Sequence, residues 1–134
     1  MLAMSKKEKE NIQIKVSTDE ELKKFLKQKG LLVLEVYSEW CGPCLGMVGS
    51  LEKVRNKMGG DNLHLAVCKA DTISTLKRFR RKSKPVWIFV NKGKAVNMYS
   101  GSEGPELCKM IVEEMKLLSV PNRASYKIEK EIKR

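Results

Sequence analysis

The chain has 134 residues, and its 27 Lys and Arg outweigh 16 Asp and Glu, which gives a formal net charge of +11 with the single His neutral. One domain fits this length, and 42% hydrophobic with 32% charged residues fits a folded globular chain and excludes disordered and collagen-like classes. Because no stretch supplies the ~20 apolar residues of a membrane span and the Lys-rich start lacks the apolar core of a signal peptide, we expect a cytoplasmic protein without a membrane partner.

Hydrophobic periodicity, capping residues and turn residues divide the sequence into alternating strands and helices. The predicted elements, in chain order, are a strand at 12–16, a helix at 18–29 ended by Gly30, a strand at 31–37, a helix at about 41–58, a strand at about 63–70, a short helix at 73–81, strands at 86–90 and 95–99, and a helix at about 105–118. Helices join the early strands and a tight turn joins the last two, so the sheet should be mixed, with helices on both faces.

The beginning of the predicted domain carries two local signals. Apolar residues alternate with polar ones in the first strand, which predicts that Ile12, Ile14 and Val16 face inward. Ser17 and Glu20 have the spacing of a capping box, so they should cap the first helix. We divide the chain into a basic N-terminal extension at 1–10, one domain at 11–118 and a basic C-terminal tail at 119–134.

A Cys-Gly-Pro-Cys motif lies between a predicted buried strand and a predicted helix, the setting in which CxxC indicates a redox-active dithiol. Two intervening residues bring the sulfurs of Cys41 and Cys44 close enough for a disulfide. Cys41 at the helix N-terminus should be the attacking thiolate, and Cys44 the resolving thiol. Trp40 should shield the site, and Pro43 should restrict the loop.

The cysteines have two other possible roles, in a zinc site or in the core. A zinc site would need two more ligands, and the remaining candidates, Cys68, Cys108 and His64, form no second CxxC or HxxxH. We therefore expect no metal and no cofactor. Cys68 in a strand and Cys108 in an amphipathic helix are typical of small buried hydrophobic residues.

The strand at 33–37, the motif Trp40–Cys44, the pair Lys84-Pro85 and two later glycines together resemble the thioredoxin family over about residues 11–118. This resemblance implies an α/β thioredoxin fold with a mixed five-stranded sheet in the order 1-3-2-4-5, flanked by four helices. It also implies that Pro85 is a cis-proline beside the dithiol and that Lys84 offers backbone to an extended substrate. The residues implied in substrate binding are Trp40, Gly42, Pro43, Lys84 and Pro85.

Glu35 stands where thioredoxins carry a buried Asp, six residues before the first cysteine. The resemblance assigns it the proton of the resolving thiol, and it therefore joins Cys41 and Cys44 as a predicted catalytic residue. The chain departs from the family at Gly49, where a helix proline is usual. It departs again near Val67, where the lysine that usually pairs with the strand Asp is absent.

Several short sequence segments resemble one ciliary subfamily of thioredoxins. This subfamily comprises the light chains of axonemal outer-arm dynein and the thioredoxin modules of ciliary thioredoxin/nucleoside-diphosphate-kinase proteins. The segments are Lys29-Gly30-Leu31, Val36-Tyr37, Leu63-His64-Leu65-Ala66, Ala70-Asp71 and Phe79-Arg80. The resemblance implies an axonemal light chain of the cilium or flagellum, with dynein heavy chains or other axonemal proteins as partners. The alternative is a soluble cytosolic thioredoxin that reduces protein disulfides. The sequence leaves open whether the chain turns over as an enzyme or serves mainly as a structural subunit.

The segment from Lys77 to Lys84 places six cations in eight residues directly before Pro85. Such a cluster favours binding to acidic protein surfaces, those of tubulin and dynein among them. The alternative is that these cations form an ordinary solvated surface. Nucleic acid is disfavoured as a partner because only one aromatic residue, Phe79, lies among these cations.

In the basic tail, Ile128 and Ile132 are four positions apart, the spacing of one helical turn. This spacing is compatible with a partner-binding helix or with a frayed end.

Overall fold

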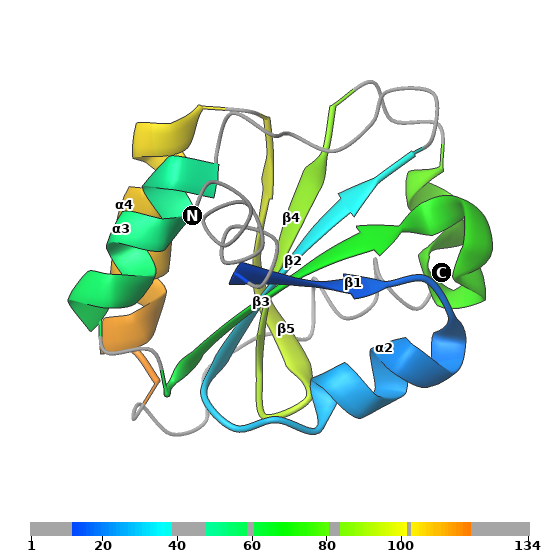
Figure 1. The fold of residues 1–134 in the computed structure, drawn as a ribbon, viewed down its shortest axis with the longest axis horizontal. Helices are drawn as coiled ribbons and strands as arrows, with labels where there is room; N and C mark the ends of the chain where they lie inside the picture. The colour runs from blue at the N-terminus through cyan, green and yellow to red at the C-terminus, as the bar shows by residue number, and fades with distance from the viewer. Residues whose placement is uncertain (1–11, 39–47, 59–60, 81–83, 102, 119–134) are drawn as a thin grey trace, which may run out of the picture.

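The computed structural model describes residues 12–38, 48–58, 61–80, 84–101 and 103–118. Its strands are β1 (Gln13–Val16), β2 (Leu31–Tyr37), β3 (Leu63–Lys69), β4 (Val86–Asn91) and β5 (Lys94–Ser100), and its helices are α2 (Asp19–Leu26), α3 (Val48–Met58), α4 (Gly104–Lys116) and the short 3-10 helices η2 (Ala70–Thr72) and η3 (Ser74–Phe79) (Figure 1). None of the described helices combines the length and apolar character needed to cross a bilayer.

The five strands form one mixed sheet in the order β1-β3-β2-β4-β5, as predicted. β1, β3 and β2 are parallel, whereas β4 runs antiparallel to β2 and to β5. The β4–β5 hairpin turns at Lys92 and Gly93, which both have positive φ, as the favoured two-residue hairpin turn requires. This topology makes β2 the centre of the sheet and leaves β1 and β5 at its edges.

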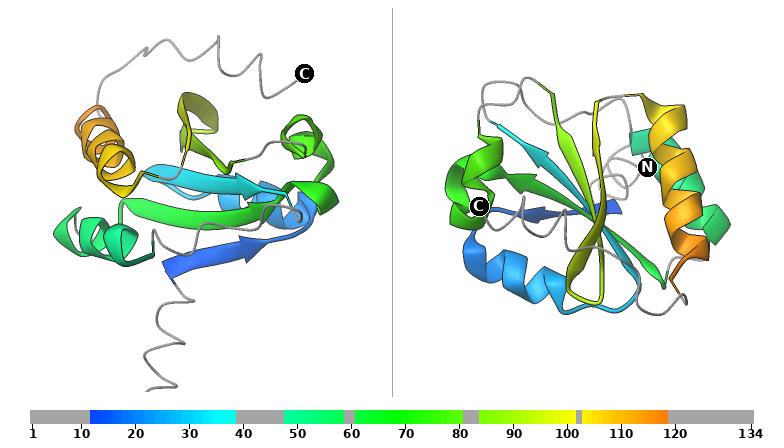
Figure 2. Two further views of the ribbon diagram at one scale, coloured as in Figure 1. Left: turned by 90° about the horizontal axis from the view of Figure 1, so that it is seen from above. Right: turned by 180° about the vertical axis from the view of Figure 1, so that it is seen from behind.

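Helices cover both faces of the sheet, so the domain has two apolar layers (Figure 2). α3 and α4 pack on one face through Leu51, Leu107 and Ile111. α2 and η3 pack on the other face, where their side chains meet alternate residues of the same strands. Because strand side chains alternate between faces, neighbouring residues of β2 belong to different layers.

The structure corrects three details of the predicted beginning of the domain. Ile14 is 49% exposed, because it lies in β1, a strand at the edge of the sheet that has a neighbouring strand on one side only. The capping box is shifted by one residue: Glu21 N donates to Thr18 Oγ1 at 3.1 Å, and Ser17 contributes only its backbone N–H, which donates to Glu21 Oε1 at 3.1 Å. α2 ends at Leu26, three residues earlier than predicted.

The remaining elements follow the predicted order, with two differences. The short helix predicted at 73–81 is the 3-10 helix η3, preceded by a separate 3-10 turn, η2. α3 is described from Val48, so the predicted helical residues 41–47 lie outside the described part of the chain. Both the N-terminal extension and the basic tail also lie outside it.

Gly30 explains how β2 can begin directly after α2. Its φ of +92° suits glycine, and a Cβ there would lie 2.4 Å from the carbonyl oxygen of Asn62. The same carbonyl accepts a hydrogen bond from Leu31 N at 2.8 Å, which aligns the start of β2 with β3. The close backbone contact therefore sets the register of the central strand.

Candidate functional site

The motif residues Trp40, Cys41, Gly42, Pro43 and Cys44 lie outside the described residues, so their geometry stays a prediction. The elements on either side are described: β2 ends at Tyr37 and α3 is described from Val48. The motif is thus part of the connection that leaves the carboxyl end of the central strand. In open α/β sheets this end of the strands is where functional sites usually lie.

Ser38 anchors the start of this connection. It is 1% exposed, and its hydroxyl donates to the carbonyl oxygens of Phe79, at 3.2 Å, and of Arg80. This bond ties the residue after β2 to the end of η3, about forty positions later. It therefore brings the basic segment at 77–80 beside the start of the motif connection. Sequence reasoning missed Ser38, because a single serine carries no local signal for so distant a contact.

Glu35 is a buried carboxylate in the middle of the sheet. It is 1% exposed and lies on the face covered by α3 and α4, with Trp87 opposite it on β4 and Val67 on β3. Its Oε1 accepts a hydrogen bond from Gln13 Nε2 at 2.9 Å. A buried carboxylate without such partners would be strongly destabilising. The structure thus places the predicted acid–base group within the core, two residues before the end of β2.

Gln13 is the second residue that sequence reasoning missed. The alternation of β1 predicted it to point outward, yet it is half-buried and reaches across the sheet to Glu35. The glutamine amide stands in for the lysine that thioredoxins usually provide, since Val67 cannot donate. A buried acid in an apolar strand requires a hydrogen-bond donor from another element. Glu35 in the apolar run of β2 is therefore the sequence signal that predicts such a donor.

Lys84 and Pro85 lie directly before β4, which pairs with β2 so that Val86 is opposite Val36. Pro85 is buried, Lys84 is exposed, and both lie at the level where β2 ends. The expected cis bond before Pro85 is not found, because no described peptide bond is cis. Trans is the intrinsically preferred isomer of such a bond, by about 0.5–1 kcal/mol. The cis expectation came from the family resemblance and not from any local turn sequence.

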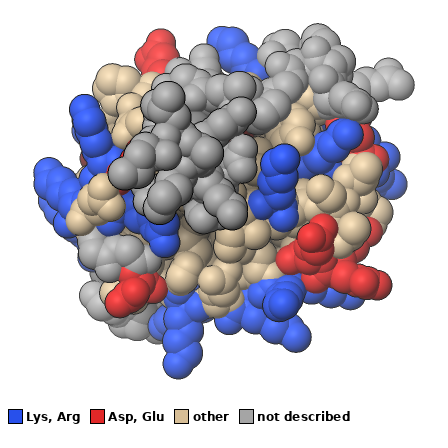
Figure 3. Space-filling view, viewed as in Figure 1, with Lys and Arg blue, Asp and Glu red and all other residues tan. Residues whose placement is uncertain are grey.

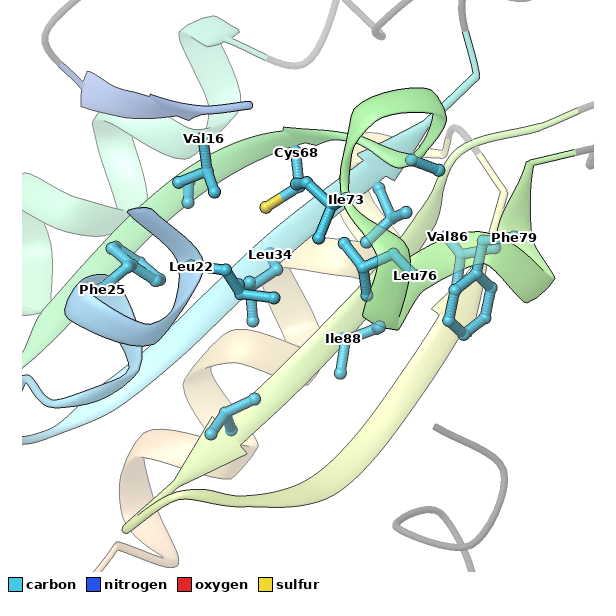
Figure 4. Close-up of a cluster of buried hydrophobic side chains, with 14 of the residues drawn as sticks. Val16, Leu22, Phe25, Leu34, Cys68, Ile73, Leu76, Phe79, Val86 and Ile88 are labelled. Atoms are coloured by element: carbon cyan, nitrogen blue, oxygen red, sulfur yellow. The ribbon is translucent and has the colours of Figure 1, made fainter. Parts of the chain in front are cut away.

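The two cysteines outside the motif are unreactive by environment. Cys68 is fully buried among the apolar side chains between the sheet and α2, with its sulfur directed into that layer (Figure 4). Burial raises the pKa of its thiol to about 12, and the negative charge of Glu35 adds to the rise. Burial also raises the pKa of Cys108, whose Sγ lies 3.7 Å from the carbonyl oxygen of Ser50. Both thiols stay protonated at neutral pH, and the predicted core role of Cys68 is confirmed.

The basic cluster divides into structural and exposed cations. Arg80 Nε donates to the carbonyl oxygen of Ala70 at 2.7 Å, so this side chain braces η2 against η3. Arg78 lies over the Phe79 ring at 5.7 Å, but it is exposed, as are Lys77 and Lys84. Elsewhere on the surface, Figure 3 shows Lys and Arg spread over many parts of one face. Among the described members of the cluster, Lys77, Arg78 and Lys84 are therefore open to a partner, and Arg81 and Lys82 lie outside the described residues.

Comparison with known proteins identifies the same fold and family. The thioredoxin family model matches residues 13–116. The chain is 40% identical over 110 residues to thioredoxin domain-containing protein 6 of Xenopus laevis, a match that covers 82% of this chain and 18% of that protein. It is 36% identical over 111 residues to the human protein of the same name, covering 83% of this chain and 34% of that protein. The chain thus spans only about a third or less of the length of these relatives.

Two solved structures show the same arrangement of strands and helices. Fasciola hepatica thioredoxin superposes with a TM-score of 0.61 at 21% identity, covering 75% of this chain and 98% of the other. Mitochondrial thioredoxin 3 of Saccharomyces cerevisiae, in its oxidised form, gives 0.63 at 23% identity, covering 78% and 98%. At this level of identity the likeness concerns the fold.

The environment of Cys68 predicts a pH dependence of stability. Its pKa in the folded protein, about 12, lies above the ordinary thiol value of 9.0, so the unfolded chain loses this proton at lower pH than the folded one. The stabilisation is complete below pH 9 and should be lost as the pH rises toward 12. In urea unfolding experiments, the free energy of unfolding of Cys68→Ala should therefore fall less steeply above pH 9 than that of the wild type. Parallel curves for the two proteins would contradict this assignment.

Proposed function

This chain belongs to the thioredoxin family, and from that premise we propose that it exchanges thiols and disulfides with protein partners through Cys41 and Cys44. One observation carries the proposal: the buried carboxylate of Glu35 lies in the strand that leads into the Cys-Gly-Pro-Cys motif, six residues before its first cysteine. A carboxylate is costly inside a sheet, and such groups commonly mark functional sites. Here it can serve a proton transfer at the neighbouring dithiol.

The exchange proceeds in two steps. The Cys41 thiolate attacks one sulfur of a partner disulfide, which forms a mixed disulfide and releases the other partner sulfur as a thiolate. Cys44 then loses its proton to the Glu35 carboxylate and attacks the Cys41 sulfur. This step closes the Cys41–Cys44 disulfide and releases the second partner sulfur. Two electrons pass to the partner, whose two thiolates take up the proton held by Glu35 and one from water, so the partner ends as a dithiol and the chain as a disulfide.

Gln13 acts in this scheme as a positioning residue. Its amide holds one oxygen of Glu35 at 2.9 Å, which fixes the carboxylate in the apolar layer beneath α3 and α4. Glu35 is one methylene longer than the aspartate that is usual in thioredoxins. An aspartate side chain has one rotatable bond fewer than that of Glu35. The hydrogen bond from Gln13 therefore restricts the additional rotation that the longer side chain allows. This hydrogen bond supports a role in proton transfer, because it holds the carboxylate in a fixed position.

We further propose that the chain works as a thioredoxin-like light chain of an axonemal assembly, the outer-arm dynein being the first candidate. The sequence segments shared with that ciliary subfamily support this role. The relative that is 40% identical over 110 residues carries the matched domain as 18% of its length. Such relatives use the domain as one module of a larger protein. The free cytosolic reductase is the second candidate, because the dithiol and Glu35 would serve it equally.

The exposed cations beside the motif support a partner with an acidic surface. Ser38 ties the end of η3 to the start of the motif connection, so Lys77 and Arg78 belong to the element that is anchored to this connection. Positive charge there speeds the encounter with acidic proteins, an effect that salt screens. Dynein chains and tubulin are the partners proposed for this surface.

The chemistry is tested by exchanging single cysteines for serine. Cys41→Ser should reduce a disulfide-bonded test protein no faster than the uncatalysed background, because the attacking sulfur is gone. Cys44→Ser should accumulate a mixed disulfide through Cys41, visible as a dithiothreitol-sensitive adduct by mass spectrometry. Cys108→Ser is the matched control and should behave as the wild type, since that thiol stays protonated. Full activity in Cys41→Ser would contradict the proposed exchange.

The cellular role is tested by fractionating ciliated cells that express the tagged chain. As a light chain it should stay with the axoneme through detergent and leave in high salt together with dynein heavy chains. Lys77→Glu with Arg78→Glu should release it at lower salt, whereas the same charge change in exposed α3 residues, Lys53→Glu with Lys57→Glu, should not. A chain found wholly in the soluble fraction would contradict the axonemal role and favour the free reductase.

A further inference from the structure

An apolar groove of about 440 Å³ lies on the face of the domain covered by α2 and η3. Leu22 and Leu26 of α2 form one wall, Leu76 of η3 closes one end, and Leu34, Ile88 and Val90 of the sheet form the floor. The close-up shows Leu22, Leu34, Leu76 and Ile88 gathered in this layer (Figure 4). The groove extends to Gly93 in the β4–β5 turn and is separate from the dithiol connection at the other end of β2.

Four polar side chains line the rim of the groove, Asp19, Lys23, Ser74 and Thr75, and three of them are engaged with one another. Ser74 Oγ donates to Asp19 at 2.8 Å, and Thr75 N donates to the same carboxylate at 3.3 Å. These bonds join the start of α2 to η3 and hold the rim in place. Small-molecule sites usually add a few polar groups that orient the ligand, and here three of the four rim groups serve the fold. The groove suits apolar side chains from a peptide segment.

The described chain ends after α4, on the face of the sheet opposite the groove but at the same end of the domain as the β4–β5 turn (Figure 2). β5 runs away from the hairpin turn to Ser100, and α4 begins at Gly104 and returns alongside the sheet, so α4 ends at the same end of the domain as the turn (Figure 2). Gly93 in that turn borders the groove. A chain that continues from α4 needs to pass only the edge strand β5 to reach the opposite face.

The tail has the length and chemistry to fill the groove. Residues 119–134 extend to about 50 Å at ~3.3 Å per residue, several times the radius of gyration of about 13 Å of a 100-residue domain. Ile128 and Ile132 lie one helical turn apart, the spacing by which a peptide helix enters an apolar groove. The tail has five basic residues against two acidic ones. The first turn of α2 is acidic and borders the groove through Asp19, and Lys23 borders it one turn later.

We propose that residues 119–134 fold back past the β5 edge and lay Ile128 and Ile132 into the groove between α2 and the β4–β5 hairpin. The apolar side chains bury against Leu26 and Val90, and the basic residues around them face the acidic start of α2. The groove is thus an internal docking site for the tail of the same chain.

Hydrogen exchange of the full chain, followed by mass spectrometry, tests this docking. Ile128→Asp with Ile132→Asp should speed amide exchange in α2 and in residues 90–95 by at least about threefold, because their cover is lost. Glu129→Gln with Glu131→Gln is the matched control between those positions and should leave exchange in α2 unchanged. Leu26→Ser, on the groove side, should speed exchange in residues 124–134 while β2 and β3 keep their protection.

Three outcomes would overturn the proposal. Unchanged exchange of α2 and residues 90–95 in the double isoleucine variant would mean that the tail does not cover the groove. Faster exchange in β5 alone would mean that the tail pairs with the edge strand. Protection of α2 that weakens on dilution of the wild type would mean that the groove holds the tail of a second copy.

Discussion

The central strand β2 carries the constraint from which the site follows. It pairs with β3 on one side and β4 on the other, and six of its seven residues are buried. A strand without access to water must find a partner for every polar group, and Glu35 is such a group. Gln13 supplies a hydrogen bond from the first strand, so the position of β1 in the sheet and the placement of the buried acid depend on each other.

The alternation of side chains along β2 divides the domain into two functional layers. Glu35 shares its face with α3 and α4, the layer next to the proposed dithiol chemistry. Leu34 faces the opposite layer, which holds the unreactive Cys68 and the apolar groove. The start of the motif connection is fixed from that second side, because Ser38 bonds to the end of η3. The residues described on either side of the dithiol segment thus belong to different layers, Ser38 bonding to η3 and α3 packing on the other face, while the groove occupies only one layer.

Local sequence patterns predicted the strands and turns well where neighbouring residues alone determine the backbone conformation. The apolar run of β2 gave its bounds without error, and the glycine of the hairpin turn located the β4–β5 pair. Local patterns did not predict the positions of side chains that are held by residues far away in the sequence. Gln13 lies 22 positions from its partner Glu35, and the partners of Ser38 lie about forty positions away. The helix cap was displaced because Ser17 and Thr18 offer the same chemistry. Ile14 was assigned to the core because alternation does not reveal that a strand lies at an edge.

The central claim is that the Glu35 carboxylate, held by Gln13, serves the Cys41–Cys44 dithiol. The most direct test follows the side-chain carboxyl carbon of Glu35 by NMR across the pH range, in the disulfide and in the dithiol form of the full chain. The account predicts different titration curves for the two forms, because a reduced Cys44 can exchange its proton with Glu35 and a disulfide cannot. Coincident curves would mean that the buried acid is only a structural group, and they would contradict the account.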